Sequence, residues 1–225
     1  MSDCRFSIRH PLPSTHQVPR PYCAADRVRW YFARRYPRRK SGIASKLFRQ
    51  GESDRLHLVR TWIPNWDGLA VLDAGCGDGA FMHSLLNGRP AHLRLEDFAH
   101  SWAAMAHERL LNEADKVEAV MADIRTADDA TRYDVVLALG VFDYNADWLG
   151  LLNRLMSRSK GIVVADFPKA GTLHGWVRRM WLGAHGINLQ STDRKRLDLL
   201  LDRVGASAQV EELPLQWITQ IRISQ

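Results

Sequence analysis

Three glycines at alternate positions, Gly75, Gly77 and Gly79, stand between a short apolar run and a helical pattern. Glycine reaches positive φ angles at no steric cost and lets a ligand approach the bare main chain. A helix that begins directly after such a turn offers free N–H groups and the positive end of its dipole. The spacing differs by one residue from the G-x-G-x-x-G dinucleotide fingerprint, which disfavours a nicotinamide oxidoreductase. The acidic Asp73 and Asp78 favour a ligand that carries a positive group.

The turn belongs to a chain in which short apolar runs alternate with helical patterns from Leu69 onward. Alternation of this kind implies a parallel sheet with helices on both faces. Two last runs, 209–213 and 217–223, lie close together and predict an antiparallel hairpin. We therefore expect an α/β fold with a seven-stranded, mostly parallel sheet. The other predicted strands are 69–72, 92–95, 117–121, 134–139 and 161–165. Helices are predicted over 80–86 and 147–156. A further helix places Trp102, Met105 and Ala106 on one face, and the last begins at Asp193.

Three segments flank or interrupt this pattern. Residues 1–25 are rich in proline and show no period, which predicts an extended or disordered arm. Residues 26–66 contain two helical stretches, ended by Pro37 and Pro64, and are expected to form an N-terminal helical cap. The main domain then covers 67–225, with an irregular insert at 169–190 that breaks the alternation. No run is long enough to span a membrane, and the start of the chain lacks the apolar core of a secretory signal.

The positive charge is concentrated at one end of the chain. Residues 1–60 hold 14 Lys and Arg against 4 Asp and Glu, whereas residues 61–225 hold 17 against 21. Such a segment either attracts acidic partners or is a solvated tail. The three cysteines, Cys4, Cys23 and Cys76, lack the spacing of a zinc site and indicate free thiols in a reducing cytoplasm.

The segment VLDAGCGDGAF, residues 71–81, resembles motif I of the class I S-adenosylmethionine-dependent methyltransferases. The resemblance implies a Rossmann-like fold and S-adenosylmethionine as the cofactor. It places Asp73 near the methionine amino group of the cofactor and packs Gly75, Gly77 and Gly79 against it. Cys76 inside the loop is then a small packing residue and not a nucleophile.

Two further segments resemble positions that follow the second and third strands in this family. LEDFAHSWAAMA supplies the acid expected at the ribose hydroxyls, and MADI supplies the acid expected at the adenine amino group. From the residues alone, the first acid can also cap a helix and the second can belong to a solvated turn. The resemblance therefore predicts Asp97 at the ribose, with Glu96 as the alternative, and Asp123 at the adenine. The other predicted cofactor contacts are Phe98 and Ile124, which follow these acids, and Leu139 from the fourth-strand segment.

The reaction needs an acceptor and, for an oxygen of high pKa, a general base. Candidate bases near the carboxyl edge of the sheet are Asp143, Tyr144, His174 and His185, each of which also has an ordinary structural explanation. In the insert, Trp176 and Trp181 predict a flat apolar wall for a planar substrate. The segments DRVRWYF and GVFDY resemble those of the magnesium-protoporphyrin O-methyltransferases. We expect methyl transfer to a small, planar or aromatic metabolite, first of all at oxygen, with nitrogen and carbon as alternative acceptor atoms.

Two alternatives stay open beside this function. A methyltransferase of RNA or protein would use the basic arm, although the D/N-P-P-aromatic signature is absent after the fourth strand, where GVFDY stands. A protein that binds the cofactor without transferring methyl is the other. We expect a small-molecule partner, no nucleic acid, no membrane span, no metal, a cytoplasmic location and possible homodimers.

Overall fold

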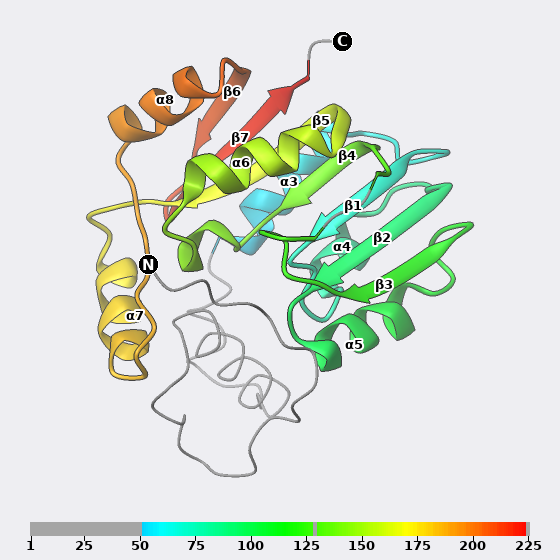
Figure 1. The fold of residues 1–225 in the computed structure, drawn as a ribbon, viewed down its shortest axis with the longest axis horizontal. Helices are drawn as coiled ribbons and strands as arrows, with labels where there is room; N and C mark the ends of the chain where they lie inside the picture. The colour runs from blue at the N-terminus through cyan, green and yellow to red at the C-terminus, as the bar shows by residue number, and fades with distance from the viewer. Residues whose placement is uncertain (1–50, 128–129, 224–225) are drawn as a thin grey trace.

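The computed structural model describes residues 51–127 and 130–223, which form one seven-stranded sheet. The strands lie in the order β3-β2-β1-β4-β5-β7-β6 (Figure 1). This order confirms the predicted Rossmann-like, mostly parallel sheet with an antiparallel pair at the C-terminal end. The strands are β1 (Ala70–Ala74), β2 (His92–Asp97), β3 (Val117–Met121), β4 (Tyr133–Ala138), β5 (Ser159–Pro168), β6 (Ser207–Glu212) and β7 (Gln216–Arg222).

Strand order reverses between β1 and β4. The chain runs outward from β1 through β2 to β3, then crosses back to pair β4 with the other side of β1 in parallel. In open parallel sheets, ligands bind outside the carboxyl ends of the strands at such a switch point. A ligand-binding site is therefore expected at the loops that follow Ala74 and Ala138.

Helices cover both faces of the sheet. One layer consists of α3 (Glu52–Trp62), α4 (Ala80–Leu85) and α5 (His100–Leu110), and the other of α6 (Trp148–Ser157) and α8 (Arg194–Arg203) (Figure 1). Because side chains alternate along a strand, Val71 packs with the first layer and Leu72 with the second. Both are fully buried, as expected for a central parallel strand.

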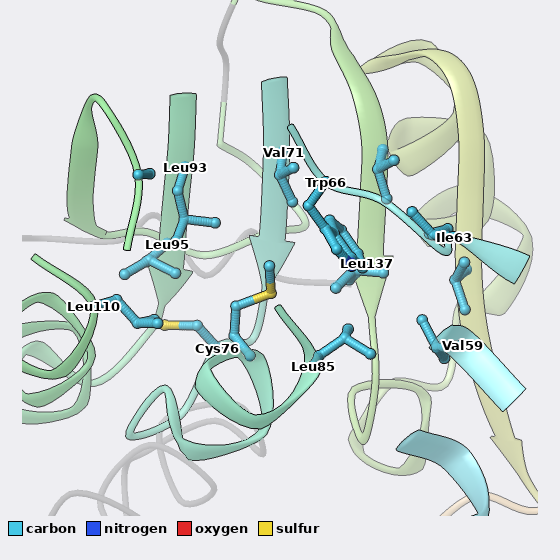
Figure 2. Close-up of a cluster of buried hydrophobic side chains, with 14 of the residues drawn as sticks. Val59, Ile63, Trp66, Val71, Cys76, Leu85, Leu93, Leu95, Leu110 and Leu137 are labelled. Carbon is cyan, nitrogen blue, oxygen red and sulfur yellow. The ribbon is translucent and has the colours of Figure 1, made fainter. Parts of the chain in front are cut away.

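Helix α3 packs into the hydrophobic core on one face of the sheet. Its Val59, together with Ile63 and Trp66 just beyond its end, is buried against Val71 and Leu137 (Figure 2). The structure thus confirms the second of the two predicted helical stretches, the one ended by Pro64, and places it in the first helical layer. The other helical stretch expected in the cap, and the arm over 1–25, lie outside the described residues.

Several sequence-based expectations need correction. The insert expected to be irregular contains a regular helix, α7 (Leu173–Gly183), which begins where the Thr172 side chain accepts a hydrogen bond from the Gly175 N–H at 3.0 Å. Met105 is 39% exposed, although Trp102 on the same predicted face is buried. Strand β5 is longer than 161–165 because it pairs with β7 as far as Pro168. No helix in the described part of the chain is both long and apolar enough to cross a bilayer.

Candidate cofactor and acceptor site

The glycine loop lies at the carboxyl end of β1, in a conformation that needs glycine. Gly75, Gly77 and Gly79 have φ angles of 86°, 55° and 72°. The N–H groups of Gly75 and Cys76 both donate to the carbonyl oxygen of Glu96, at 2.7 and 3.0 Å, which ties the loop to the end of β2. A Cβ atom at Gly77 would lie 2.9 Å from the Trp102 ring. Both the backbone angles and the packing therefore exclude larger residues here.

Asp73, at the end of β1, is a buried carboxylate without a donor. Its exposed fraction is 8%, and among the described residues no N–H or O–H lies within hydrogen-bond distance of its side chain. Burial, followed by the nearby charge of Asp97, raises the pKa of Asp73 to about 7. A buried carboxylate is stable when a cation or a donor partners it. This position therefore fits a positively charged ligand group.

Asp97, at the end of β2, faces the same loop. Its two oxygens accept hydrogen bonds from the Gly77 N–H at 3.1 Å and the Ala99 N–H at 2.8 Å. Burial raises the pKa of Asp97 to about 6, although these two hydrogen bonds lower it. A carboxylate has about four acceptor positions, so two remain for a ligand. Asp97 does not cap α5, because the residue before the first turn of that helix is Ala99.

The backbone carbonyl of Glu96 contacts the glycine loop, but its side chain belongs to an internal ion network. The two nitrogens Nη1 and Nη2 of Arg158 each donate to one of its oxygens at 2.7 Å, and Arg94 donates at 2.8 Å. The Glu96 side chain is fully buried. Burial alone would raise the pKa of Glu96, but the bonds from Arg158 and Arg94 hold it below the usual value. Of the two adjacent acids, Asp97 is therefore the one placed for a ligand.

Asp123 follows β3 and is held by its neighbour. Its Oδ1 accepts hydrogen bonds from the Arg125 backbone N–H at 3.0 Å and from Arg125 Nε at 2.9 Å. A ligand amino group at this carboxylate would share it with the Arg125 guanidinium. Ile124 packs against the second core layer, and Leu139 packs against the first.

On the other side of the switch point, a short 3-10 turn after β4, η1 (Phe142–Tyr144), meets α7. Arg178 of α7 donates to the buried Asp143 carboxylate and, through Nη2, to the Tyr144 hydroxyl at 2.5 Å. Although burial disfavours the guanidinium charge, Asp143 and Tyr144 raise the pKa of Arg178 above its usual value. The structure thus brings two of the predicted catalytic residues together around one buried cation.

A further buried carboxylate, Asp166 near the end of β5, contacts both α3 and the loop after β4. Its oxygens accept hydrogen bonds from Arg55 of α3 at 2.7 Å and from the Gly140 N–H at 2.6 Å. The Arg55 guanidinium also lies over the ring of Phe81, 5.3 Å from its centroid, at the start of α4. Arg55 therefore connects the helix of the glycine loop with the loop after β4.

A family model described as a methyltransferase domain matches residues 71–160, which include the glycine loop, Asp97, Asp123 and η1. The chain carries a methyltransferase domain over these residues. The predicted enzyme class and fold are thereby confirmed. Methyltransferases of this class use S-adenosylmethionine, the cofactor expected from motif I. A search of curated protein sequences finds no match.

Solved structures resemble the methyltransferase over most of its length. One is magnesium protoporphyrin IX methyltransferase from Synechocystis PCC 6803 with bound S-adenosylhomocysteine, at 19% identity and a TM-score of 0.71, with 90% of this chain and 100% of that chain covered. Another is an N-methyltransferase from Bradyrhizobium japonicum WM9, at 14% identity and a TM-score of 0.55, with 80% and 98% covered. A putative O-methyltransferase from Nostoc punctiforme PCC 73102 has 18% identity and a TM-score of 0.61, with 80% and 58% covered. At these identities, the likeness concerns the fold.

The remaining predicted residues of the methyltransferase lie on α7 or at its end. His174 lies one turn before Arg178 on this helix. The Nδ1 of His185 lies 2.8 Å from the Trp181 carbonyl oxygen, which engages the ring with the last turn of its own helix. Trp176 and Trp181 are 61% and 52% exposed. The flat apolar wall that these two rings were expected to form stays a prediction.

Three residues of the methyltransferase site were missed by sequence reasoning: Arg55, Asp166 and Arg178. Asp166 directly follows the apolar run 161–165, so the rule of an acid after a predicted strand was sufficient to find it. The two arginines left no comparable signal, because their partners are 111 and 35 residues away in sequence.

A groove of about 630 Å³ lies elsewhere in the methyltransferase, between α5 and the edge strand β3. None of the predicted site residues lines it. Over the described ranges, no group of three His, Cys, Asp or Glu is placed to hold a metal ion.

Cys76 of the methyltransferase is expected to resist thiol reagents. It is buried in the first core layer, and burial followed by the charges of Asp73 and Asp97 raises the pKa of its thiol well above the usual range. Only the thiolate reacts rapidly. In a chain with Cys4→Ser and Cys23→Ser, labelling with a chromogenic disulfide should await denaturant. Rapid labelling of the native double variant would contradict the packing role.

Proposed function

We propose that this protein transfers a methyl group from S-adenosylmethionine to an oxygen of a small, planar or aromatic metabolite. The observation that carries the proposal is the buried Asp73 carboxylate, which accepts no hydrogen bond from residues 51–127 or 130–223 and adjoins a loop whose backbone angles need glycine. A ligand that combines an ammonium group with a flat nucleoside suits this arrangement.

The cofactor supplies an activated methyl group on a sulfonium. In the proposed arrangement Asp73 holds the methionine ammonium, and the two unused acceptor positions of Asp97 receive the ribose hydroxyls. Asp123 accepts from the adenine amino group beside Arg125. The residues that flank these acids, Phe98, Ile124 and Leu139, then line the nucleoside, while Gly75, Gly77 and Gly79 admit it to the main chain.

The acceptor is proposed to lie beyond the loop after β4, where Tyr144 and Asp143 meet Arg178. Because the Tyr144 oxygen accepts a hydrogen bond from Arg178, its own proton is directed elsewhere. The guanidinium also stabilises negative charge on that oxygen. Tyr144 is therefore suited to take a proton from an acceptor hydroxyl, with Asp143 and Arg178 as positioning residues. The likeness to an enzyme named for magnesium protoporphyrin IX, a planar macrocycle, supports a flat acceptor.

The proposed role of Asp73 predicts a pH-dependent affinity for S-adenosylhomocysteine. The ligand's ammonium binds the ionised carboxylate, and the pKa of Asp73 is about 7. Below that pH the carboxyl must lose a proton on binding, so the affinity should fall by up to about tenfold per pH unit. Above about pH 8 it should be constant. Calorimetric titration in buffers of different ionisation enthalpy measures both the affinity and the proton released.

The matched variant is Asp73→Asn, which keeps the shape and removes the charge. It should bind more weakly and lose the dependence that arises from the carboxyl of residue 73. A wild-type affinity that does not change between about pH 5.5 and 8 would refute the assigned ammonium contact.

The acceptor class is tested by transfer of labelled methyl. Purified enzyme is incubated with methyl-labelled S-adenosylmethionine and, separately, a small-molecule extract, total RNA and total protein. Label in the small-molecule extract, released by base if the product is an ester, supports the proposal. Label in RNA or protein favours the macromolecular alternative and a role for the basic residues 1–60. The cytoplasmic location, possible homodimers, and the domain boundaries at 25, 66, 169 and 190 stay predictions.

A further inference from the structure

The carboxylate of Asp123 is fully engaged by Arg125, two residues further along the chain. Its Oδ1 atom accepts hydrogen bonds from the Arg125 backbone N–H at 3.0 Å and from Nε at 2.9 Å. The same Nε–H is shared with Oδ2 at 3.1 Å, and Nη2 also donates to Oδ2. A carboxylate has about four acceptor positions, so these contacts occupy them all. Asp97, by contrast, keeps two such positions for a ligand.

The turn that follows β3 builds this ion pair locally. The N–H groups of Thr126 and Ala127 both donate to the Asp123 carbonyl oxygen, at 2.9 and 2.7 Å. The chain thereby turns around Arg125, and an aspartate at the start of such a turn readily bonds the backbone two residues on. All of these contacts lie within residues 123–127, so the ion pair accompanies the turn itself.

The two side chains of the pair differ in exposure. The Asp123 side chain is 12% exposed, whereas that of Arg125 is 45% exposed. The carboxylate is thus turned inward, and the guanidinium partly reaches solvent. Ion pairs of this kind contribute little to stability, so a ligand that offers the carboxylate a donor can compete with the guanidinium.

A carboxylate and a guanidinium select opposite groups on a purine. The 6-amino group of adenine donates N–H bonds, and it therefore competes with Arg125 for the Asp123 oxygens. The 6-carbonyl oxygen of hypoxanthine is an acceptor, which a carboxylate repels and a guanidinium attracts. Asp123 without Arg125 would discriminate for adenine, whereas the two side chains together offer a partner to either base.

We propose that Arg125 relaxes the base selectivity of the cofactor site, so that S-adenosyl and S-inosyl compounds bind with similar affinity. Arg125 weakens the binding of adenine because it occupies the acceptor that adenine needs. It supports hypoxanthine because it donates to the carbonyl oxygen. This role rests on the proposed function, through the contact of Asp123 with the base, and it concerns the nucleoside end of the cofactor only.

Calorimetric titration of the full-length protein with S-adenosylhomocysteine and with S-inosylhomocysteine tests this role. The affinities of the wild type for the two ligands should agree within about fivefold. Arg125→Met keeps a long unbranched side chain and removes the charge. It should bind S-adenosylhomocysteine about two- to fivefold more tightly, since the competitor is gone. It should bind S-inosylhomocysteine about tenfold or more weakly, because the carbonyl oxygen then meets the carboxylate without the guanidinium.

Two further variants separate the possible causes. Arg194→Met is the matched control, because Arg194 donates to Asp198 at 2.8 Å in another partly exposed pair, and it should keep both wild-type affinities. In the double variant Asp123→Asn, Arg125→Met, the preference for S-adenosylhomocysteine should disappear, because an amide offers both a donor and an acceptor. The preference is a ratio measured in one protein, so a general loss of affinity cancels.

Two results would overturn the role of Arg125. These are a wild type that already prefers S-adenosylhomocysteine by more than about fivefold, and a preference that Arg125→Met does not raise. If the double variant then loses the preference, the contact between Asp123 and adenine still stands. If all forms show the same preference, that contact is wrong as well. The titrations use no methyl acceptor, so the proposed transfer to a small metabolite succeeds or fails separately.

Discussion

Replacing Glu96 by alanine is expected to lower the free energy of unfolding by about 3–5 kcal/mol. The side chain is fully buried and accepts hydrogen bonds from both terminal nitrogens of Arg158 at 2.7 Å and from Arg94 at 2.8 Å. Its removal takes away the carboxylate that both terminal nitrogens of the buried Arg158 contact. Breaking a buried pair from one side is costly, because the remaining charge is neither solvated nor neutralised. Urea denaturation measures the change.

Two variants separate this effect from loss of volume. The double variant Glu96→Leu, Arg158→Leu removes both charges and should recover most of the lost stability. Asp97→Ala, one residue along, should instead weaken cofactor binding by ~1–3 kcal/mol. If Glu96→Ala unfolds like the wild type, the ion network is not a source of stability.

The same network contributes a pH dependence with a defined sign. The pKa of Glu96 is lower in the folded protein than its ordinary value of 4.5. The unfolded chain therefore binds its proton first as the pH falls. The contribution to stability is complete above about pH 5 and is lost as the pH falls through the folded pKa.

Tyr144→Phe is expected to slow methyl transfer by roughly 10²–10⁴-fold if the phenol removes the acceptor's proton. The substitution deletes one oxygen and keeps the ring, so the packing of η1 should survive. The affinity for S-adenosylhomocysteine should stay unchanged, because the phenol belongs to the acceptor side of the site. Single-turnover transfer to the labelled acceptor fraction measures the chemical step.

Variants of the surrounding residues test whether Tyr144 is the general base. Arg178→Lys keeps a charge but loses the two-pronged contact with Asp143 and Tyr144, and should shift the pH–rate profile as well as lower the rate. His185→Gln is the control, since the ring contacts the carbonyl of its own helix. A Tyr144→Phe enzyme with wild-type turnover would show that positioning alone suffices, or that His174 is the base.

The cofactor half of the site was predictable because its signals are local. Asp73 and Asp97 each follow an apolar run, and the three glycines between them lie within a span of five residues, 75–79. The alternation of strands and helices predicted the parallel sheet, whereas the order of its strands comes from the structure. The spacing of the glycines disfavoured a dinucleotide, and the resemblance of the segment to motif I indicated S-adenosylmethionine.

The acceptor half was less predictable because its contacts are distant in sequence. Arg178 meets Asp143 across 35 residues, and nothing in the sequence around either identifies the other. Helix α7 was missed for a related reason. Its apolar stripe has helical spacing, but the stripe is not buried in the core, and the sequence was interpreted as an irregular insert whose two tryptophans form a flat apolar wall. Glu96 and Asp97 are adjacent acids, and only the position of Arg158, 62 residues away from Glu96, separates their roles.

The contact between Gly75 and Val141 joins the two halves. A Cβ atom at Gly75 would lie 2.5 Å from the Val141 Cγ2 atom, and Val141 precedes η1. The free space above the main chain of the glycine loop is thus limited by the Val141 side chain, which belongs to the loop after β4. Enlarging either residue would displace both loops together. An attempt to change acceptor preference by redesigning the loop after β4 will therefore also alter how the methyl donor fits, and the two specificities cannot be engineered separately.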